Sequence, residues 1–240
     1  MCPIRDRSTA CLASTTRHGE MTVNRVQLAH MIDHTLLKPE ATADDVKALI
    51  DQGRRLGVYG ICVCPSLLPV DAQGLHVVSV CGFPDGAHTS VIKATEAAQA
   101  VSRGAEEIDM VMNLGLAKAA DWSGVRDDIA KVRQGVPSPV VLKVIIESAA
   151  LTDEEIVLAC RAALDAGADF IKTSTGFHPA GGATVHAVRL IKDTVGTNLQ
   201  VKASGGIHSF QAAEALIEAG ATRLGMSGTE AVLAGLDRAA

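Results

Sequence analysis

Short runs rich in valine and isoleucine alternate with segments of helical periodicity along most of the chain. Because parallel strands are joined by crossover connections that are usually helical, this alternation favours a parallel sheet. Eight strand–helix units in about 210 residues predict a single α/β domain, a (β/α)8 TIM barrel. A doubly wound open sheet is the alternative, although no Gly-x-Gly-x-x-Gly motif follows the first strand. The expected strands are Met31–His34, Val58–Cys64, His76–Cys81, Glu107–Asn113, Val140–Ile146, Ala168–Ser174, Leu199–Ala203 and Thr222–Met226.

Local signals mark where the helices begin and end. Thr42 precedes Asp45 by three residues and Thr152 precedes Glu155 by three, which is the spacing of a capping box. Helical patterns also cover 89–103, 121–134, 181–195, 208–219 and 228–237. Glycine suits the left-handed end of a helix, and a weak internal repeat of Gly-Ala pairs precedes three of the apolar strands. The pairs are Gly104-Ala105, Gly167-Ala168 and Gly220-Ala221.

The chain is expected to form one domain. Of its 240 residues 48% are hydrophobic, which is too large a share for a disordered chain. We expect residues 21–240 to form the barrel and residues 1–20 to be a flexible tail, with a transit peptide or a true start at Met21 as alternatives. The tail has no apolar run, so it is not a secretory signal. No stretch approaches about 18 uncharged apolar residues, so no membrane span is predicted.

Composition argues against several classes of partner. Lys and Arg number 22 against 27 Asp and Glu, no basic run occurs, and aromatic residues make up 2%, so nucleic acid is not an expected partner. The six cysteines include no Cys-x-x-Cys pair, and the eight histidines include no His-x-x-His spacing. We therefore expect no metal site, and cysteines that are reduced thiols in the cytoplasm.

Lys172 is the first candidate for a catalytic residue. With the two-residue period of a strand, Lys172 shares a face with Phe170, while Ile171 turns toward the helices. A buried lysine is rare unless it is paired, so a structural salt bridge with Glu147 or Asp109 is the alternative.

Lys202 lies on the next strand at a similar depth, about 4.8 Å away across the sheet. Two ammonium groups about 6 Å apart repel by roughly 3 kcal/mol at an effective dielectric of about 20, and burial acts in the same direction. One of the two lysines is therefore expected to be partly neutral near neutral pH, as Schiff-base formation requires. The pattern does not decide which one, and each lysine being neutralised by its own carboxylate remains the alternative.

Other polar residues are expected around these lysines. Asp109 on the fourth strand faces the same cavity, where a carboxylate relays protons or holds a water molecule; its alternative role is counter-ion to Lys202 or Lys143. Lys143 and Glu147 lie four residues apart on one strand face, and we expect them to pair beside the catalytic groups. Cys62 is either a reactive thiol near the cavity or a packing residue, the second being the simpler reading.

Two glycine-rich turns follow the last two strands, and each precedes an expected helix. One contains Gly205 and Gly206, and the other contains Ser227 and Gly228. Free amides and the positive end of a helix then face one point, where barrels often bind phosphate. Gly176, after the sixth strand, offers a third set of amides.

Six segments resemble the deoxyribose-phosphate aldolases, a family of class I aldolases. They span roughly Met31 to Leu236 in the right order, and the two blocks that begin with Lys172 and Lys202 are together highly specific. The segments are 32–39 (IDHTLLKP), 82–84 (GFP), 107–113 (EIDMVMN), 142–147 (LKVIIE), 172–177 (KTSTGF) and 202–207 (KASGGI).

This resemblance implies a barrel that works in the cytoplasm without a metal or organic cofactor, as a homodimer or homotetramer. It implies reversible cleavage of a small phosphorylated sugar, 2-deoxy-D-ribose 5-phosphate, to D-glyceraldehyde 3-phosphate and acetaldehyde, in the breakdown of deoxyribonucleosides. By position, Lys172 resembles the Schiff-base lysine, Lys202 the neighbour that lowers its pKa and shuttles protons, and Asp109 the proton-relay carboxylate. The positions that resemble the family's phosphate site are Gly205, Gly206, Ser227 and Gly228.

The chain departs from the family pattern at two places. Met226 stands in the last glycine turn, where a smaller or hydroxyl residue is expected, and the terminal tyrosine of some members is missing after Asp237. Two other functions stay open. A phosphate-binding isomerase or lyase would use Asp109 and Lys202 as base and acid, with Lys172 only ion-paired. A non-catalytic phosphometabolite-binding protein would gain nothing from two facing lysines.

Overall fold

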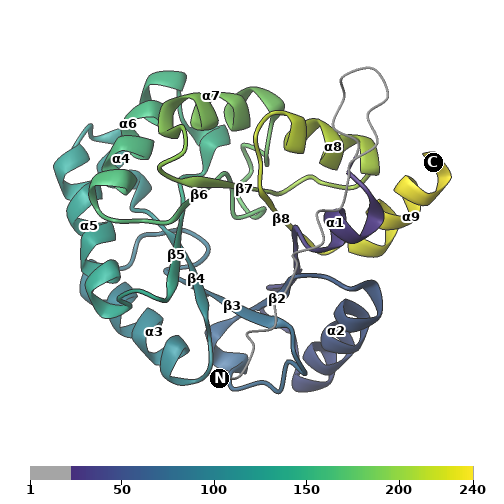
Figure 1. Cartoon of the computed structure of the whole chain (residues 1–240). Helices are drawn as coiled ribbons and strands as arrows, with labels where there is room; N and C mark the ends of the chain where they lie inside the picture. Colours follow the sequence, from purple (N-terminus) through teal and green to yellow (C-terminus); the bar gives the residue numbers. More distant parts are fainter. Residues whose placement is uncertain (1–22, 240) are drawn as a thin grey trace, which may run out of the picture.

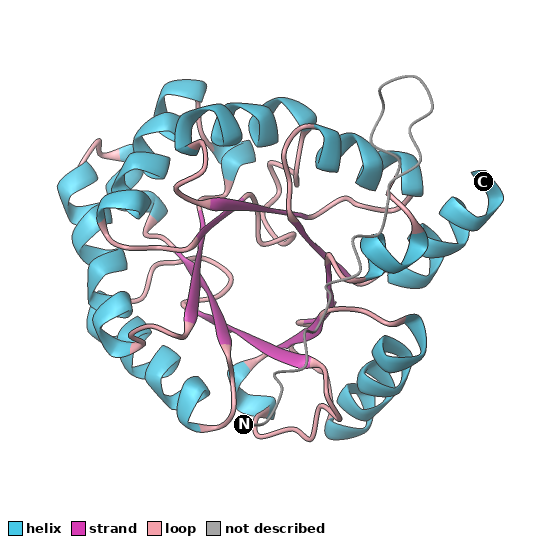
Figure 2. Ribbon diagram, viewed as in Figure 1, coloured by secondary structure: helices cyan, strands magenta, loops and turns pink. Residues whose placement is uncertain are grey.

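The eight strands of the computed structural model close into one barrel, in which every neighbouring pair is parallel. The structure describes residues 23–239, so the tail expected at 1–20 lies outside it. Figures 1 and 2 show the ring of strands at the centre and the helices around it. Pairing of the last strand with the first excludes an open sheet. The predicted (β/α)8 barrel is confirmed.

All the predicted strands are present, each within two residues of its expected ends. The strands are β1 (Ile32–Leu36), β2 (Gly60–Val63), β3 (His76–Cys81), β4 (Glu107–Val111), β5 (Val141–Ile145), β6 (Phe170–Lys172), β7 (Gln200–Ser204) and β8 (Arg223–Met226). The helices are α1 (Arg25–Ala29), α2 (Ala43–Leu56), α3 (Ser90–Ser102), α4 (Leu114–Lys118), α5 (Trp122–Gly135), α6 (Asp153–Asp165), α7 (Val185–Val195), α8 (Phe210–Glu218) and α9 (Thr229–Ala239). Two short 3-10 helices are η1 (Pro65–Leu67) and η2 (Ser148–Ala150).

The expected one-to-one match of strands and helices fails between β2 and β3. These strands are joined by η1 and a turn rather than by an α-helix. Pro65 and Pro69 fall in this connection, and proline has no backbone N–H for a helical hydrogen bond. Two short helices, α1 and α4, were not predicted; their N-caps are Asn24 and Asn113.

The expected helix boundaries are confirmed where the signal is local. Thr42 and Thr152 each form a capping box with the acidic residue three positions later. The three Gly-Ala pairs each end a helix, with the glycine at positive φ. In each pair the alanine N–H bonds to a carbonyl five residues back, as in Ala105 to Ala100 at 3.0 Å, which satisfies a helix-end carbonyl. Each pair thereby turns the chain back toward the barrel.

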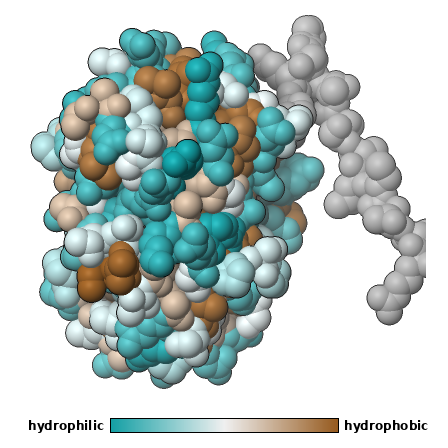
Figure 3. All heavy atoms as spheres, turned by 90° about the vertical axis from the view of Figure 1, so that its left-hand side faces the viewer, coloured by the Kyte–Doolittle hydropathy of each residue, from teal (hydrophilic) through white to brown (hydrophobic). Residues whose placement is uncertain are grey.

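Apolar side chains fill the layer between strands and helices. Outward-facing strand residues such as Ile108, Leu142 and Ile171 are fully buried there. On the side of the molecule over α3 to α6, the outer surface is mainly hydrophilic with separate apolar spots (Figure 3). No helix within residues 23–239 is long and apolar enough to cross a membrane. The interior of the barrel differs: its small apolar cluster is restricted to residues on or just after β1 to β3, including Cys62 and Val80.

Candidate active site

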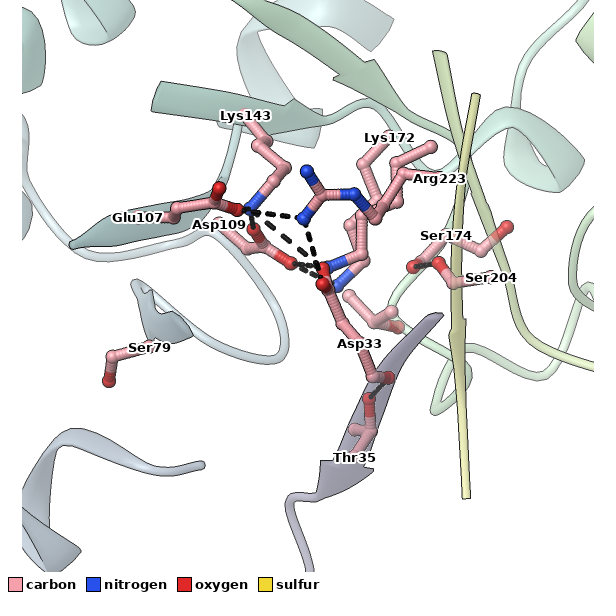
Figure 4. A network of polar contacts seen from close by, with 12 residues as sticks. Asp33, Thr35, Ser79, Glu107, Asp109, Lys143, Lys172, Ser174, Ser204 and Arg223 are labelled. Atoms are coloured by element: carbon pink, nitrogen blue, oxygen red, sulfur yellow. Dashed lines mark hydrogen bonds and ion pairs between the residues drawn. The ribbon is translucent and has the colours of Figure 1, made fainter. Parts of the chain in front are cut away.

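Seven charged side chains from β1 and β4 to β8 are joined by ion pairs inside the barrel. Figure 4 labels all of them except Lys202 and shows that they point toward one another. All seven are less than one-tenth exposed. Their ion pairs form one connected cluster, called here the barrel network. Its members are the cations Lys143, Lys172, Lys202 and Arg223 and the carboxylates Asp33, Glu107 and Asp109.

Asp109 is the centre of the barrel network because it binds three lysines. Its Oδ2 lies 2.7 Å from Nζ of Lys172 and 2.7 Å from Nζ of Lys202. Its Oδ1 lies 2.8 Å from Nζ of Lys143. Lys172 and Lys202 are register partners across β6 and β7, as the sequence predicted. Since both nitrogens contact one oxygen at 2.7 Å, they lie no more than about 5.4 Å apart, which is closer than the separation of about 6 Å assumed from the sequence.

The two lysines differ in their second partner. Lys202 also donates to Asp33, whereas Asp109 is the carboxylate that pairs with Lys172. Burial lowers the pKa of Lys172; Asp109 opposes this effect and the Lys202 ammonium adds to it. Burial also disfavours charge on Lys202, but Asp109 and Asp33 outweigh it and raise the pKa of Lys202 above its usual value. The geometry therefore favours Lys172 as the lysine that gives up its proton more readily, a choice that the sequence pattern left open.

Asp109 stays a carboxylate in this setting. Burial alone would raise its pKa, but Lys143, Lys172 and Lys202 hold the pKa of Asp109 well below its usual value. A permanently anionic Asp109 can accept hydrogen bonds from an amine or a water molecule and orient them. Lys172 donates to it, which leaves the nitrogen lone pair of a neutral Lys172 free for chemistry.

The expected pairing of Lys143 with Glu147 is not observed. Nζ of Lys143 lies 2.5 Å from Glu107 and 2.8 Å from Asp109. Glu147 instead accepts hydrogen bonds from the N–H and the hydroxyl of Thr175, the latter at 2.6 Å. The reason is local: β5 ends at Ile145, and Glu147 has a φ of +53°, so the two-residue alternation of side chains no longer applies. Lys143 thus belongs to the barrel network, and Glu147 supports the loop after β6.

Cys62 lies fully buried on β2, facing the barrel interior. Burial raises the pKa of Cys62 to about 11; Asp109 adds to this effect, and Lys202 and Lys172 oppose it. The side chain packs in the apolar cluster with Val78 and Val80. A neutral thiol in apolar contact fits the packing role better than that of a nucleophile.

A cavity of about 430 Å³ opens at the carboxyl ends of β1, β6, β7 and β8. The buried side chain of Lys172 forms part of the lining of this cavity. Four of the five expected phosphate residues line it, namely Gly176, Gly205, Gly206 and Ser227. Gly228 lies one residue beyond Ser227 and is not part of the lining. Met226, where the chain departs from the family pattern, does line the cavity and is itself 5% exposed.

The glycines of this cavity are required by the backbone. Gly176 and Gly205 have φ angles of +83°, a conformation that other residues adopt at a cost. A Cβ on Gly205 would lie 3.0 Å from Cα of Gly182, where the loop after β6 comes close. Within residues 23–239, the N–H groups of Gly205 and Gly206 take part in no turn or loop hydrogen bond. Such amides are available to an anion.

The sequence did not single out several residues of the cavity. Lys38, exposed after β1, adds a positive charge beside the glycine turns. Phe177 is half exposed and forms an apolar wall, in edge-to-face contact with Phe83 at 5.3 Å. Both residues stand inside conspicuous sequence blocks, 32–39 and 172–177. Nothing in either block indicated which side chains turn toward the cavity.

The carboxylates of the site are committed to protein cations rather than arranged for a metal. Within residues 23–239, no group of three or more His, Cys, Asp or Glu side chains has the arrangement of a metal site. Asp33 and Glu107 both pair with Arg223, at 2.9 Å and 3.1 Å.

Known proteins resemble this chain over nearly its full length. The family model for DeoC/LacD family aldolases matches residues 27–237. A deoxyribose-phosphate aldolase of Kocuria rhizophila is 62% identical over 216 residues, which make up 90% of this chain and 99% of that protein. The same enzyme of Corynebacterium diphtheriae is 60% identical, over 87% of this chain and 96% of its own.

Solved structures agree with these sequence relatives. The tetrameric deoxyribose phosphate aldolase of Aeropyrum pernix superposes with a TM-score of 0.83 at 30% identity, over 90% of this chain and 94% of that chain. A putative deoxyribose-phosphate aldolase of Coccidioides immitis gives a TM-score of 0.81 at 35% identity, over 88% of this chain and 86% of its own.

Proposed function

Because the chain belongs to the DeoC/LacD family of aldolases, we propose that it cleaves 2-deoxy-D-ribose 5-phosphate reversibly to D-glyceraldehyde 3-phosphate and acetaldehyde, through a Schiff base on Lys172. The observation that carries this proposal is the asymmetry of the two facing lysines. Lys202 is bound by two carboxylates and keeps its proton, whereas burial and the Lys202 ammonium favour the neutral amine on Lys172.

Lys172 is the nucleophile of the proposed reaction. Its neutral amine attacks C1 of the open-chain sugar, and the resulting carbinolamine loses water to form an iminium. Loss of the proton from the C3 hydroxyl then breaks the C2–C3 bond. The bonding electrons move to the iminium, which becomes an enamine, and D-glyceraldehyde 3-phosphate leaves. Protonation of the enamine at C2, followed by addition of water, releases acetaldehyde and restores the amine.

Asp109 and Lys202 handle protons in this scheme. An ammonium has three N–H bonds, and Lys202 directs two of them to Asp33 and Asp109. The third is available to a water molecule that protonates the departing hydroxyl of the carbinolamine. Asp109, held anionic, orients this water and the Lys172 amine. In the bond-breaking step, the proton of the C3 hydroxyl passes to the same water.

The glycine turns and Lys38 bind the phosphate in this proposal. Among residues 23–239, the amides of Gly205 and Gly206 take part in no turn or loop hydrogen bond. Ser227 adds another amide and a hydroxyl, and Gly176 completes the rim. Lys38 contributes the ionic attraction that amides alone lack. Apolar Phe177 and Met226 line the cavity as well, which suits an uncharged, partly apolar aldehyde.

The setting of the enzyme is part of the proposal. Cytoplasmic location is supported by the four cysteines among residues 23–239, all of which are free thiols. A homodimer or homotetramer is supported by the tetrameric relative of Aeropyrum pernix. The catalytic groups named here come from the described residues of one chain and include no cofactor.

The test is a turnover assay with 2-deoxy-D-ribose 5-phosphate, in which released acetaldehyde is measured. Wild-type protein is expected to release it, and Lys172→Arg is expected to lose turnover while keeping its fold by circular dichroism. Lys118→Arg, which changes an exposed lysine bound to Glu155, serves as the matched control and should remain active. Near wild-type turnover by Lys172→Arg would refute the Schiff-base assignment and favour acid–base chemistry by Asp109 and Lys202.

A further inference from the structure

Arg223 and Glu107 are the members of the barrel network that connect to the substrate cavity only through other members. Arg223 begins β8 and Glu107 begins β4, so both lie at the amino ends of their strands, and neither lines the cavity. The guanidinium of Arg223 stacks 3.6 Å from the ring centre of Tyr59 and pairs with Asp33 and Glu107. The hydroxyl of Tyr59 donates to Glu107 at 2.7 Å. This stacked and hydrogen-bonded arrangement fixes both charges in position.

Contacts lead from these two residues to the lysines without a break. Glu107 binds Lys143 at 2.5 Å, and Lys143 binds Asp109, which holds Lys172. On the other side, Arg223 binds Asp33, which holds Lys202. A change of charge at Arg223 or Glu107 therefore alters the electrostatic potential at Lys172 through two chains of ion pairs. All the groups in these chains are buried, so salt screens the effect little.

The charges of the barrel network do not balance when every group is ionised. Four cations face three carboxylates, a surplus of one positive charge. The network becomes neutral when one cation loses its proton. Arginine does not lose its proton in proteins, and Lys202 is held by two carboxylates. Lys172 is the cation that reaches the cavity, where a proton can leave.

We propose that Arg223 and Glu107 are positioning residues whose opposite charges control the protonation of the Lys172 amine while the enzyme awaits its substrate: the Arg223 cation favours the unprotonated amine, and the Glu107 carboxylate favours the protonated one. This inference rests on the proposed function, because it assigns Lys172 the attacking amine. It goes further by placing control of that amine at the opposite end of the barrel.

Groups on the remaining elements do not alter this count. On β2, Cys62 is a neutral thiol, because burial raises its pKa to about 11. On β1, the buried His34 turns outward to Gln52 and Thr229. Beyond β5, Glu147 is bound by Thr175, outside the barrel network. The inward residues of β3 include the apolar Val78 and Val80.

The experiment measures the pH dependence of adduct formation on Lys172 with acetaldehyde, trapped by sodium borohydride, in the full-length protein. Arg223→Gln removes a positive charge, which should favour the protonated amine. The acid limb of the pH–rate profile, where the rate rises as Lys172 loses its proton, should therefore move to higher pH. Glu107→Gln removes a negative charge and should move it to lower pH. For charges roughly 10 Å apart at an effective dielectric of about 20, each displacement is about one pH unit.

Two further variants separate charge from structure. Arg223→Gln combined with Glu107→Gln restores the balance, so its acid limb should return close to that of the wild type, although it is changed at two buried positions. Tyr59→Phe removes the hydrogen bond to Glu107 without changing charge and should leave the limb in place. If Arg223→Gln does not fold, Glu107→Gln and Tyr59→Phe carry the comparison.

The outcomes distinguish this inference from the function on which it rests. No adduct on wild-type Lys172 would refute the proposed function. A wild-type adduct together with unmoved acid limbs in the charge variants, or with displacements of the same sign in both, would refute the role of Arg223 and Glu107 alone. An acid limb that is displaced further in the double variant than in either single variant would also refute it. The effects of removing opposite charges cancel, whereas the effects of structural damage add.

Discussion

Replacing Lys202 by methionine should move the acid limb of the pH–rate profile for adduct formation on Lys172 to higher pH. The change keeps the length of the side chain but removes the ammonium that shares Oδ2 of Asp109 with Lys172. Two nitrogens bound to one oxygen are roughly 5 Å apart, and unit charges at that distance repel by about 3 kcal/mol at an effective dielectric of about 20. This corresponds to about two pH units. Without Lys202, protonated Lys172 is favoured by that amount.

The assay is the rate of borohydride-trapped adduct formation with acetaldehyde, followed from acidic to alkaline pH. Below the wild-type limb, Lys202→Met should react about 100-fold more slowly, and the deficit should shrink as pH rises. Lys93→Met is the matched control, because Lys93 is also fully buried and pairs with Asp128 at 2.8 Å, but between α3 and α5. A folded Lys202→Met variant with an unmoved limb would refute the electrostatic reasoning.

Three further outcomes follow from the cavity and the core. Lys38→Met should raise KM for 2-deoxyribose 5-phosphate by about tenfold and leave KM for unphosphorylated 2-deoxyribose unchanged, since one charge-assisted contact is worth about 1.5 kcal/mol; equal changes for both sugars would remove Lys38 from the phosphate site. Gly205→Ala should raise the same KM, because its φ is +83° and the added Cβ meets Gly182. Gly57→Ala, at a φ of +72° with open space around it, should affect stability alone. Matching kinetics for the two variants would count against phosphate binding by the glycine turns. Burial lowers the pKa of His34 below the usual 6.5, so the unfolded chain takes up a proton first on acidification, and the free energy of unfolding in urea should fall as pH drops below 6.5. His34→Gln should lose part of this pH dependence, and identical slopes for both proteins would contradict the assignment.

Much of the fold was predictable because it depends on neighbours in sequence. The capping boxes at Thr42 and Thr152 and the glycine at position 104 act over five residues or fewer, and the structure confirms them. Strand positions follow from apolar runs for the same reason. The connection after β2 was less predictable, because the count of units suggested a helix and only Pro65 and Pro69 argued against it.

The site was predictable only in part, since its contacts join distant residues. Alternation within β6 was enough to turn Lys172 inward, and strand adjacency placed Lys202 beside it. Alternation failed for Glu147, which lies beyond the end of β5 in a left-handed conformation. Asp33 and Arg223 are 190 residues apart, and no local sequence pattern predicts that they pair. Asp33 also pairs with Lys202, which lies 169 residues away, and this ion pair is what makes the two facing lysines unequal, so the sequence pattern alone could not rank them.

Borohydride trapping with acetaldehyde, followed by intact mass and peptide mapping, tests the central claim most directly. The account predicts one stable adduct, in the peptide that contains Lys172. An adduct on Lys202 would contradict the assignment of the two lysines while keeping aldolase chemistry. No adduct, with substrate demonstrably bound, would contradict the Schiff-base mechanism itself.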